Sequence, residues 1–255
     1  MQKISRFFQR IGMDPQTVIE QSAAFLGAVQ TNCVLHIAYE NLDILANRPL
    51  DLSPDALYEK IVLNGRGGYC FELNGLLSHM LREMGFTVSE RFSRFLRGES
   101  SVPMRRHRVV VVHLEDGDYL CDIGVGQIAP RLPLKIEENT VQTQNGETYR
   151  FAKDARHGWI LWELHHDEWR EYICFTDDAA YDVDFWQPSF FCEKHPDSPF
   201  NKSYMLAIKT PNGRRTIDGC TYKVFDGEEL VDIAENLSEE RLHSLFQNEF
   251  YLTVS

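Results

Sequence analysis

The spacing of apolar residues changes twice along the chain and divides it into three parts. Over residues 1–85 apolar positions recur at helical intervals, most clearly from Leu73 to Met84. From Phe86 the period falls to two, as in strands that bury one face. Six segments follow this second pattern: 86–96, 108–114, 118–123, 148–152, 158–165 and 168–175.

The last part of the chain mixes both periods. Two strand-like segments flank Pro211-Asn212-Gly213, and a short helix is predicted to begin after Ser238. We therefore predict an α+β fold with three domains: a helical domain over 1–85, an antiparallel, barrel-like β domain over 86–190, and a small α/β lid domain over 191–255.

Local signals place individual turns and helix ends. Asp14-Pro15 and Ser53-Pro54 each resemble a helix start, and Gly85 is a helix stop. Asp116-Gly117 is a strong hairpin turn signal, and Asn145-Gly146 indicates a second turn.

Cys70 stands at the junction of a loop and a helix. Gly67 and Gly68 precede it and predict a sharp bend, and the helical spacing places Cys70 in the first turn on the buried face. Unpaired N–H groups and the helix dipole favour a thiolate there, and the cationic Arg66 acts in the same direction. We therefore predict a nucleophile with a lowered pKa; the alternative is a cysteine that only packs in the core.

A nucleophilic cysteine needs a base and an orienting group. His107 begins a strand before the predicted turn, and Asp122 lies on the returning strand. A two-residue turn at Asp116-Gly117 would pair Asp122 with Val111, on the face of His107 but about 13 Å from it along an ideal ladder. Contact therefore requires a bulge or a curled strand, which Gly124 and Gly126 permit.

Other assignments stay open at this point. His113 shares the face of His107, and Asp122 could cap a strand end. His165 and His166 resemble a metal pair, but adjacent strand residues point to opposite faces, so no metal site is predicted.

Composition and charge limit the functional classes. The chain has 255 residues, with 26 basic and 38 acidic side chains and a net charge of −12, which argues against a nucleic-acid partner but not against an anionic small molecule. No apolar run approaches the ~20 residues of a membrane span, and the first residues lack the pattern of an export signal. Six scattered cysteines without metal-ligand spacing favour a reduced, cytoplasmic setting.

The motifs together resemble the arylamine N-acetyltransferase family. The resemblance rests on the run from Arg66 to Asn74, on His107 after a basic pair, on the run from Asp122 to Gly126, and on Glu40-Asn41-Leu42. It implies a three-part architecture with a core similar to that of cysteine proteases. It also implies that Cys70 accepts an acetyl group from the co-substrate acetyl-CoA, with no permanently bound cofactor, and passes it to an arylamine or arylhydrazine. His107 would then be the base and Asp122 the orienting carboxylate.

The resemblance also suggests a substrate pocket and a scaffold. The expected pocket residues are Tyr39, Tyr69, Phe71, Gly124, Val125 and Gly126. Glu40 and Arg66 are expected to pair beneath the cysteine loop. The chain departs from the family at Ile37-Ala38-Tyr39, where Val-Pro-Phe is usual, and at Val125, where an aromatic residue is usual. A thiol hydrolase or transglutaminase-like enzyme and an inert binding module are the competing hypotheses.

Overall fold

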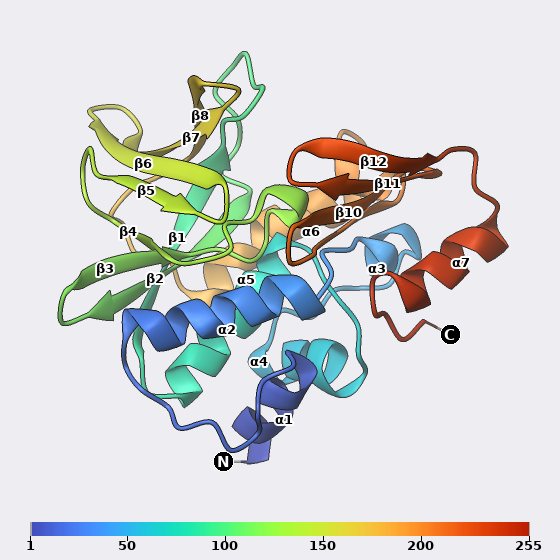
Figure 1. The fold of residues 1–255 in the computed structure, drawn as a ribbon, viewed down its shortest axis with the longest axis horizontal. Helices are drawn as coiled ribbons and strands as arrows, with labels where there is room; N and C mark the ends of the chain where they lie inside the picture. The colour runs from blue at the N-terminus through green and yellow to red at the C-terminus, as the bar shows by residue number, and fades with distance from the viewer. Residues whose placement is uncertain (1, 255) are drawn as a thin grey trace.

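The first third of the chain is helical (Figure 1): it forms five helical segments and then one long buried helix. The computed structural model describes residues 2–254. The segments are α1 (Gln2–Arg10), α2 (Ala23–His36), α3 (Leu42–Leu45), α4 (Pro54–Leu57) and the π-helical η1 (Tyr58–Leu63), and the buried helix is α5 (Cys70–Glu83).

The helix ends follow local chemistry, with one correction. Asp14-Pro15 does not begin a helix, because the Asp14 carboxylate accepts the Gln16 N–H at 2.9 Å and closes a turn instead. Helix α2 begins later, where the Ser22 side chain accepts the Phe25 N–H at 3.2 Å. Helix α5 ends as predicted, before Gly85 with its positive φ of 88°.

The middle of the chain forms one antiparallel sheet that curls into a nearly closed barrel (Figure 1). Its strands run in the order β4-β3-β2-β1-β8-β7-β6-β5. Their bounds are β1 (Thr87–Phe95), β2 (His107–Leu114), β3 (Gly117–Cys121), β4 (Leu134–Lys135), β5 (Val141–Gln144), β6 (Glu147–Asp154), β7 (Gly158–His165) and β8 (Glu168–Phe175).

Side chains join the two edges of this sheet. The Gln142 amide of β5 accepts the Lys135 N–H and donates to the Lys135 carbonyl of β4, both at 2.8 Å. Gln144 makes a similar exchange with Leu132. Glutamine side chains therefore bond to backbone N–H and C=O groups at the barrel edge, where no backbone ladder joins β4 and β5.

The β2–β3 hairpin differs in register from the prediction. Leu114 pairs with Gly117 and Val110 with Cys121, so the turn residues are Glu115 and Asp116. The predicted turn at Asp116-Gly117 is wrong by one position, and continuing the observed ladder places Asp122 opposite Val109 rather than Val111. Asp122 is thereby two residues nearer to His107 along the hairpin than the sequence analysis supposed.

The final part contains a second, four-stranded antiparallel sheet in the order β12-β11-β10-β9. The predicted strand pair around Pro211 is confirmed as β9 (Met205–Lys209) and β10 (Gly213–Asp218), and the helix after Ser238 as α7 (Glu239–Asn248). The sequence analysis missed the hairpin of β11 (Thr221–Asp226) and β12 (Glu229–Ala234). It also missed the short helices between the sheets: η2 (Gly126–Ile128), η3 (Asp182–Phe185), α6 (Trp186–Lys194) and η4 (Pro199–Asn201).

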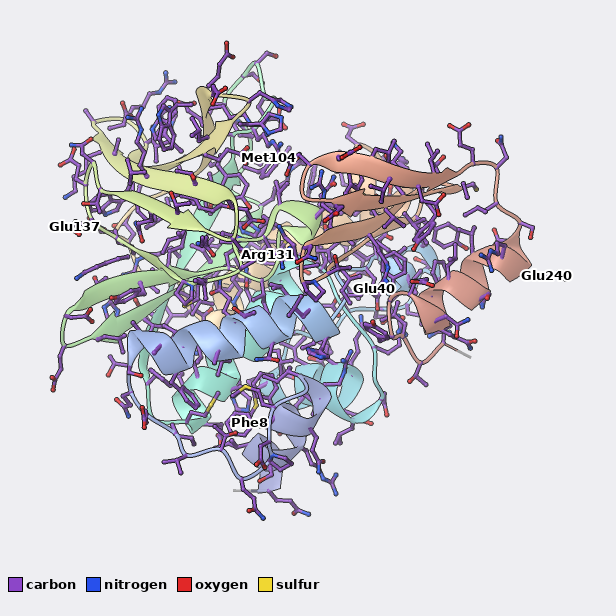
Figure 2. All side chains as sticks on the ribbon, in the orientation of Figure 1. Phe8, Glu40, Met104, Arg131, Glu137 and Glu240 are labelled. Atoms are coloured by element: carbon purple, nitrogen blue, oxygen red, sulfur yellow. The ribbon has the colours of Figure 1, made fainter. Side chains whose placement is uncertain are left out.

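The three parts meet at a short extended segment. Tyr39 exchanges two backbone hydrogen bonds with Ala207 of β9, at 2.9 and 3.0 Å, and the Glu40 N–H donates to Gly68 at 2.9 Å. Arg131, labelled between the two sheets in Figure 2, donates to the Gly213 carbonyl at 2.9 Å. The loop before Cys70, the barrel and the second sheet are thus connected directly.

The predicted α+β fold is confirmed by these elements. Helix α6 runs across residue 190, where a domain boundary was expected, and the division into 1–85, 86–190 and 191–255 stays a prediction. Within residues 2–254 no helix combines the length and apolarity needed to cross a bilayer.

Candidate active site

Cys70 is the first residue of α5, and the loop before it is held by close backbone contacts. A Cβ at Gly67 would lie 2.2 Å from the Ala38 carbonyl oxygen, and one at Gly68 would lie 2.8 Å from the Glu72 side chain. Neither glycine has a positive φ. The double glycine is therefore required by close approach rather than by an unusual backbone angle.

The electrostatic surroundings of Cys70 correct one expectation. The side chain is buried, and burial raises the pKa of the Cys70 thiol well above 9.0; the neighbouring Cys192 and Asp122 add to the shift, and the Phe71 N–H opposes it. The expected lowering of this pKa by the helix terminus and Arg66 is therefore wrong. Ionisation of the sulfur requires a proton acceptor beside it.

His107 and Asp122 are in contact. The His107 Nε2 atom lies 2.6 Å from the Asp122 Oδ2 atom, and both side chains are buried. This pairing leaves the ring Nδ1 available for a second partner. The Cys70 Sγ lies 3.8 Å from the carbonyl oxygen of Arg106, the residue before His107. The gap expected between His107 and Asp122 is closed by the observed register and by Asp122 leaving the strand after Cys121.

Asn74, one helical turn after Cys70, holds the aspartate. Its Nδ2 donates to Asp122 Oδ1 at 2.8 Å and to the Arg108 carbonyl at 2.5 Å, and its Oδ1 accepts the Ile123 N–H at 2.9 Å. The Gly124 N–H also donates to Asp122 Oδ1, at 2.9 Å. Asn74 belongs to the motif that begins at Arg66, but no local signal in the sequence indicates its contact with Asp122.

Gly124 brings the aspartate loop onto the cysteine helix. A Cβ at Gly124 would lie 2.8 Å from the Cys70 Cα and 3.1 Å from the Cys70 carbonyl oxygen. No other residue fits there without moving one of the two segments. The spacing between helix α5 and the loop after β3 therefore depends on this glycine.

Cys70 and His107 line the same cavity, which has a volume of about 390 Å³. Of the expected pocket residues, Tyr39, Gly124, Val125 and Gly126 also line it. Residues that the sequence analysis missed complete the walls, and no local motif marks them; they include Phe95, Arg106, Phe200, Met205, Lys223 and Phe225. Several come from β9, β10 and β11, so the second sheet closes one side of the site.

Tyr69 and Phe71 are not pocket residues. Both are completely buried, the Tyr69 hydroxyl shares a 2.6 Å hydrogen bond with Ser189, and the Phe71 ring packs against Phe185. The reason is helix geometry: residues that flank Cys70 at the start of a helix point in directions different from its own. The expectation that they contact substrate is corrected.

The expected ion pair of Glu40 and Arg66 is present, at 2.8 Å, and belongs to a larger network. Arg66 also contacts Asp43 at 3.1 Å, and Lys60 lies 2.7 Å from both Asp43 and Glu72. Burial opposes the charge on Arg66, but the Glu40 and Asp43 carboxylates raise the pKa of Arg66 overall. Arg66 is thus used beneath the loop and does not serve to ionise Cys70.

The competing residues are engaged elsewhere. His113 bonds to Ser89 at 2.7 Å and to Asp118 at 2.6 Å at the far end of the hairpin. His165 and His166 lie at a hairpin turn, where His166 has a positive φ of 50°. Among the described residues no group of three or more His, Cys, Asp or Glu side chains is arranged to hold a metal ion.

Comparisons with known proteins identify the family. The family profile described as N-acetyltransferase matches residues 23–255. The arylamine N-acetyltransferase / N-hydroxyarylamine O-acetyltransferase of Salmonella typhimurium is 32% identical over 98% of this chain and 88% of its own length. The arylamine N-acetyltransferase of Mycobacterium bovis is 35% identical over 78% of this chain and 73% of its own.

Solved structures agree with this assignment. The Salmonella typhimurium enzyme superposes with a TM-score of 0.94 at 28% identity, covering 100% of this chain and 93% of the other. The Mycobacterium marinum arylamine N-acetyltransferase in complex with CoA gives a TM-score of 0.91 at 28% identity, covering 98% and 93%. With matches over nearly its whole length in both sequence and structure, this chain belongs to the arylamine N-acetyltransferase family.

Proposed function

We propose that this protein transfers the acetyl group of acetyl-CoA to an arylamine or arylhydrazine through a thioester on Cys70. The observation that carries the proposal is the 2.6 Å contact of His107 with Asp122, in a cavity that Cys70 also lines. Family membership and the CoA complex of the Mycobacterium marinum relative support acetyl-CoA as the donor.

In the first half-reaction His107 takes the thiol proton of Cys70. Because burial raises the pKa of that thiol, the proton moves only when the imidazole accepts it, and Asp122 stabilises the imidazolium that forms. The thiolate attacks the carbonyl carbon of acetyl-CoA, and the oxyanion that forms needs hydrogen-bond donors, for which backbone N–H groups near the start of α5 are candidates. The C–S bond to CoA breaks, and CoA leaves with the proton from His107.

In the second half-reaction the amine nitrogen attacks the carbonyl carbon of acetyl-Cys70. His107 takes a proton from the nitrogen, the amide forms, and the Cys70 sulfur leaves and regains a proton. An aromatic amine suits this step because its low basicity keeps it unprotonated near neutral pH. Phe95, Phe200 and Phe225 on the cavity wall offer apolar contacts for an aromatic ring, and about 390 Å³ is a usual size for a small-molecule site.

Acylation in the absence of amine tests the proposal. Incubation with acetyl-CoA should add one acetyl group to the peptide that contains Cys70, measured by peptide mass spectrometry. Cys70→Ala should remove this signal. Cys220→Ala is the matched control, since Cys220 is exposed and outside the cavity, and it should leave the signal intact. Acetylation that persists in Cys70→Ala, or is absent from the wild-type protein, would contradict the proposal.

The thiol hydrolase hypothesis predicts a different fate for the acyl enzyme. If the protein is an acetyltransferase, acetyl-Cys70 should lose its acetyl group slowly in buffer alone. The rate of that loss should increase with aniline concentration, and acetanilide should form. A discharge rate that is independent of aniline would instead assign the site to hydrolysis.

A further inference from the structure

A second cavity, which we call the arginine cavity, lies outside the active site. It has a volume of about 190 Å³ and is lined by Arg94, Arg105, Arg156 and His157, and no acidic side chain lines it. The whole chain carries a net charge of −12. A small cavity lined by three arginines and no carboxylate is therefore a local positive site on an acidic protein.

Three separate segments bring these side chains together. Arg94 lies in β1 and pairs with Cys174 of β8, and its guanidinium donates to the Pro103 carbonyl in the loop that carries Arg105. Met104 of that loop is labelled in Figure 2. Arg156 and His157 occupy the turn between β6 and β7.

This turn is fixed against the end of β8. Gly158 has a positive φ of 76°, and a Cβ there would lie 2.6 Å from the Phe175 carbonyl oxygen and 3.1 Å from the Thr176 Cα. Phe175 and Thr176 also line the arginine cavity. The backbone that carries His157 and Arg156 is therefore seated at the cavity wall by a contact that only glycine allows.

The arginines have no counter-charge among the described residues. None of Arg94, Arg105 and Arg156 forms an ion pair within residues 2–254. The aspartates that flank Arg156 and the end of β8 have other partners. Asp154 accepts the N–H groups of Arg156 and His157 at 2.8 and 2.7 Å, Asp177 accepts from Trp159 at 3.0 Å, and Asp178 accepts from Thr176 at 3.0 Å.

We propose that the arginine cavity binds a phosphate group. Guanidinium groups present paired N–H donors that match phosphate oxygens, and a multiply charged anion would neutralise the excess positive charge. The cavity volume of about 190 Å³ accommodates a phosphate group. The imidazole of His157 supplies one more donor when it is protonated.

Two sources can supply this phosphate group, and one of them follows from the position of the cavity next to active-site residues. Arg105 precedes Arg106, which lines the active-site cavity, and Ser93, beside Arg94 in β1, pairs with His107. The 3′-phosphate of CoA is one source, and this alternative rests on the proposed function. Free inorganic phosphate is the other.

Binding of inorganic phosphate to the free protein tests the site without any catalysis. Melting temperature is measured against phosphate concentration, with ionic strength held constant by sodium chloride, and yields a Kd. Arg105→Gln/Arg156→Gln should raise this Kd about tenfold or more, because two charge-assisted contacts are lost. Both arginines are exposed and have no side-chain hydrogen bond to lose, so circular dichroism should be unchanged.

Arg6→Gln/Arg241→Gln is the control of equal charge, since both residues are exposed arginines outside the cavity. It should leave the phosphate Kd unchanged. Equal weakening in both double variants, or no phosphate-dependent shift in the wild-type protein, would overturn the proposal. Neither result depends on whether the protein acetylates amines.

Steady-state kinetics distinguish the two sources. If the site holds the CoA 3′-phosphate, Arg105→Gln/Arg156→Gln should lower kcat/KM about tenfold for acetyl-CoA and leave it unchanged for acetyl-3′-dephospho-CoA. If phosphate binding is weakened while both kcat/KM values stay at wild-type levels, the site takes free phosphate. Each result supports the phosphate site and assigns its source.

Discussion

Cys70 shows how one residue can satisfy two opposing demands. Its sulfur is almost inaccessible, which protects a thioester from water but raises the pKa of the thiol. The position at a helix start cannot offset that burial by itself. Reactivity must therefore come from the neighbouring imidazole, and the pair Cys70–His107 is the unit to test.

Replacement of the imidazole should expose the intrinsic behaviour of the thiol. In His107→Gln burial still raises the pKa of the Cys70 thiol and no imidazole takes its proton, so alkylation by iodoacetamide should be slow at neutral pH and should rise as the pH increases. In the wild-type protein alkylation should already be fast near neutral pH. Rates are measured by peptide mass spectrometry, with exposed Cys220 reporting the intrinsic pH dependence of the reagent. Identical pH profiles for Cys70 in both proteins would refute the dependence on His107.

Asn74 is predicted to be a positioning residue for Asp122. Asn74→Ala removes a donor to Asp122 and leaves the Ile123 N–H without its acceptor, so the carboxylate should lose its fixed orientation toward His107. We expect kcat to fall roughly 10- to 100-fold. The KM for acetyl-CoA should change little.

Ser78→Ala is the matched control for Asn74→Ala. Ser78 lies one turn later on the same helix, is equally buried, and bonds to Glu90 at 2.5 Å without touching the triad. Both variants should lose stability in thermal melts, but only Asn74→Ala should lose kcat. Equal losses of kcat would show a general structural effect and not positioning.

At the scale of elements, the site depends on how α5 meets the loop after β3. The sequence placed Cys70 at the start of a helix and His107 at the start of a strand, because periodicity and turn residues are local signals. It misplaced the hairpin turn by one residue, and that error doubled the expected separation of His107 from Asp122 along the strand. Asp-Gly is a strong turn signal, but the observed turn uses Glu115-Asp116 with Gly117 in the strand at a positive φ of 135°.

The contact of these two elements is testable at Gly124. Gly124→Ala places a Cβ 2.8 Å from the Cys70 Cα, so the loop must move away from the helix. We expect at least a tenfold loss of acylation rate, since Asp122 belongs to the same loop, and a fall of about 1–3 kcal/mol in the free energy of unfolding. Stopped-flow acylation and urea denaturation give the two quantities.

Gly27→Ala is the control for this change. Gly27 lies inside helix α2, and its added Cβ would meet the movable end of the Leu132 side chain at 3.2 Å and the Pro133 ring at an ordinary 3.9 Å. Acylation should stay at the wild-type rate, because alanine is favoured in a helix and Gly27 does not line the active-site cavity. A Gly124→Ala protein as active as Gly27→Ala would show that the close approach is unnecessary.

At the scale of the molecule, the second sheet must be held against the barrel to close the cavity. Lys209 of β9 forms a largely buried ion pair with Glu147 of β6, and Arg131 adds a contact to Gly213 of β10. Burial lowers the pKa of Lys209 although Glu147 opposes the shift. This pair therefore places a charged lysine at the junction of the two sheets.

Loss of the carboxylate at this junction should destabilise the fold. Glu147→Gln leaves a buried ammonium without its partner, and the free energy of unfolding should fall by about 3 kcal/mol near neutral pH. The folded protein releases the Lys209 proton more readily than the unfolded chain, so the loss should shrink as pH rises toward 10.5. Urea denaturation at several pH values measures it.

Asp55→Asn provides the comparison, because the Lys3–Asp55 pair lies at the surface. It should have no measurable effect on stability. If Glu147→Gln is as stable as Asp55→Asn at neutral pH, the ion pair does not hold the sheets together.

Taken by itself, the sequence indicated candidate residues for the chemistry and determined on which kinds of element they lie. The glycine pair and the apolar period are local signals, so they indicated Cys70 and the α+β fold, whereas His107 and Asp122 were singled out from their competitors by the family resemblance. The same local signals could not tell that Tyr69 and Phe71 point into the core. They also gave no sign of Phe200 or Lys223 as cavity walls.

Only the tertiary structure decided the contacts between distant segments. Strand register brought His107 to Asp122, and Asn74 and Gly124 joined helix to loop. The packing of the two sheets made the active-site cavity, and the meeting of β1, the β6–β7 turn and the end of β8 made the arginine cavity. These contacts depend on the simultaneous packing of many side chains from separate elements. No single stretch of sequence carries that information, because the free energy that selects the arrangement belongs to the whole core.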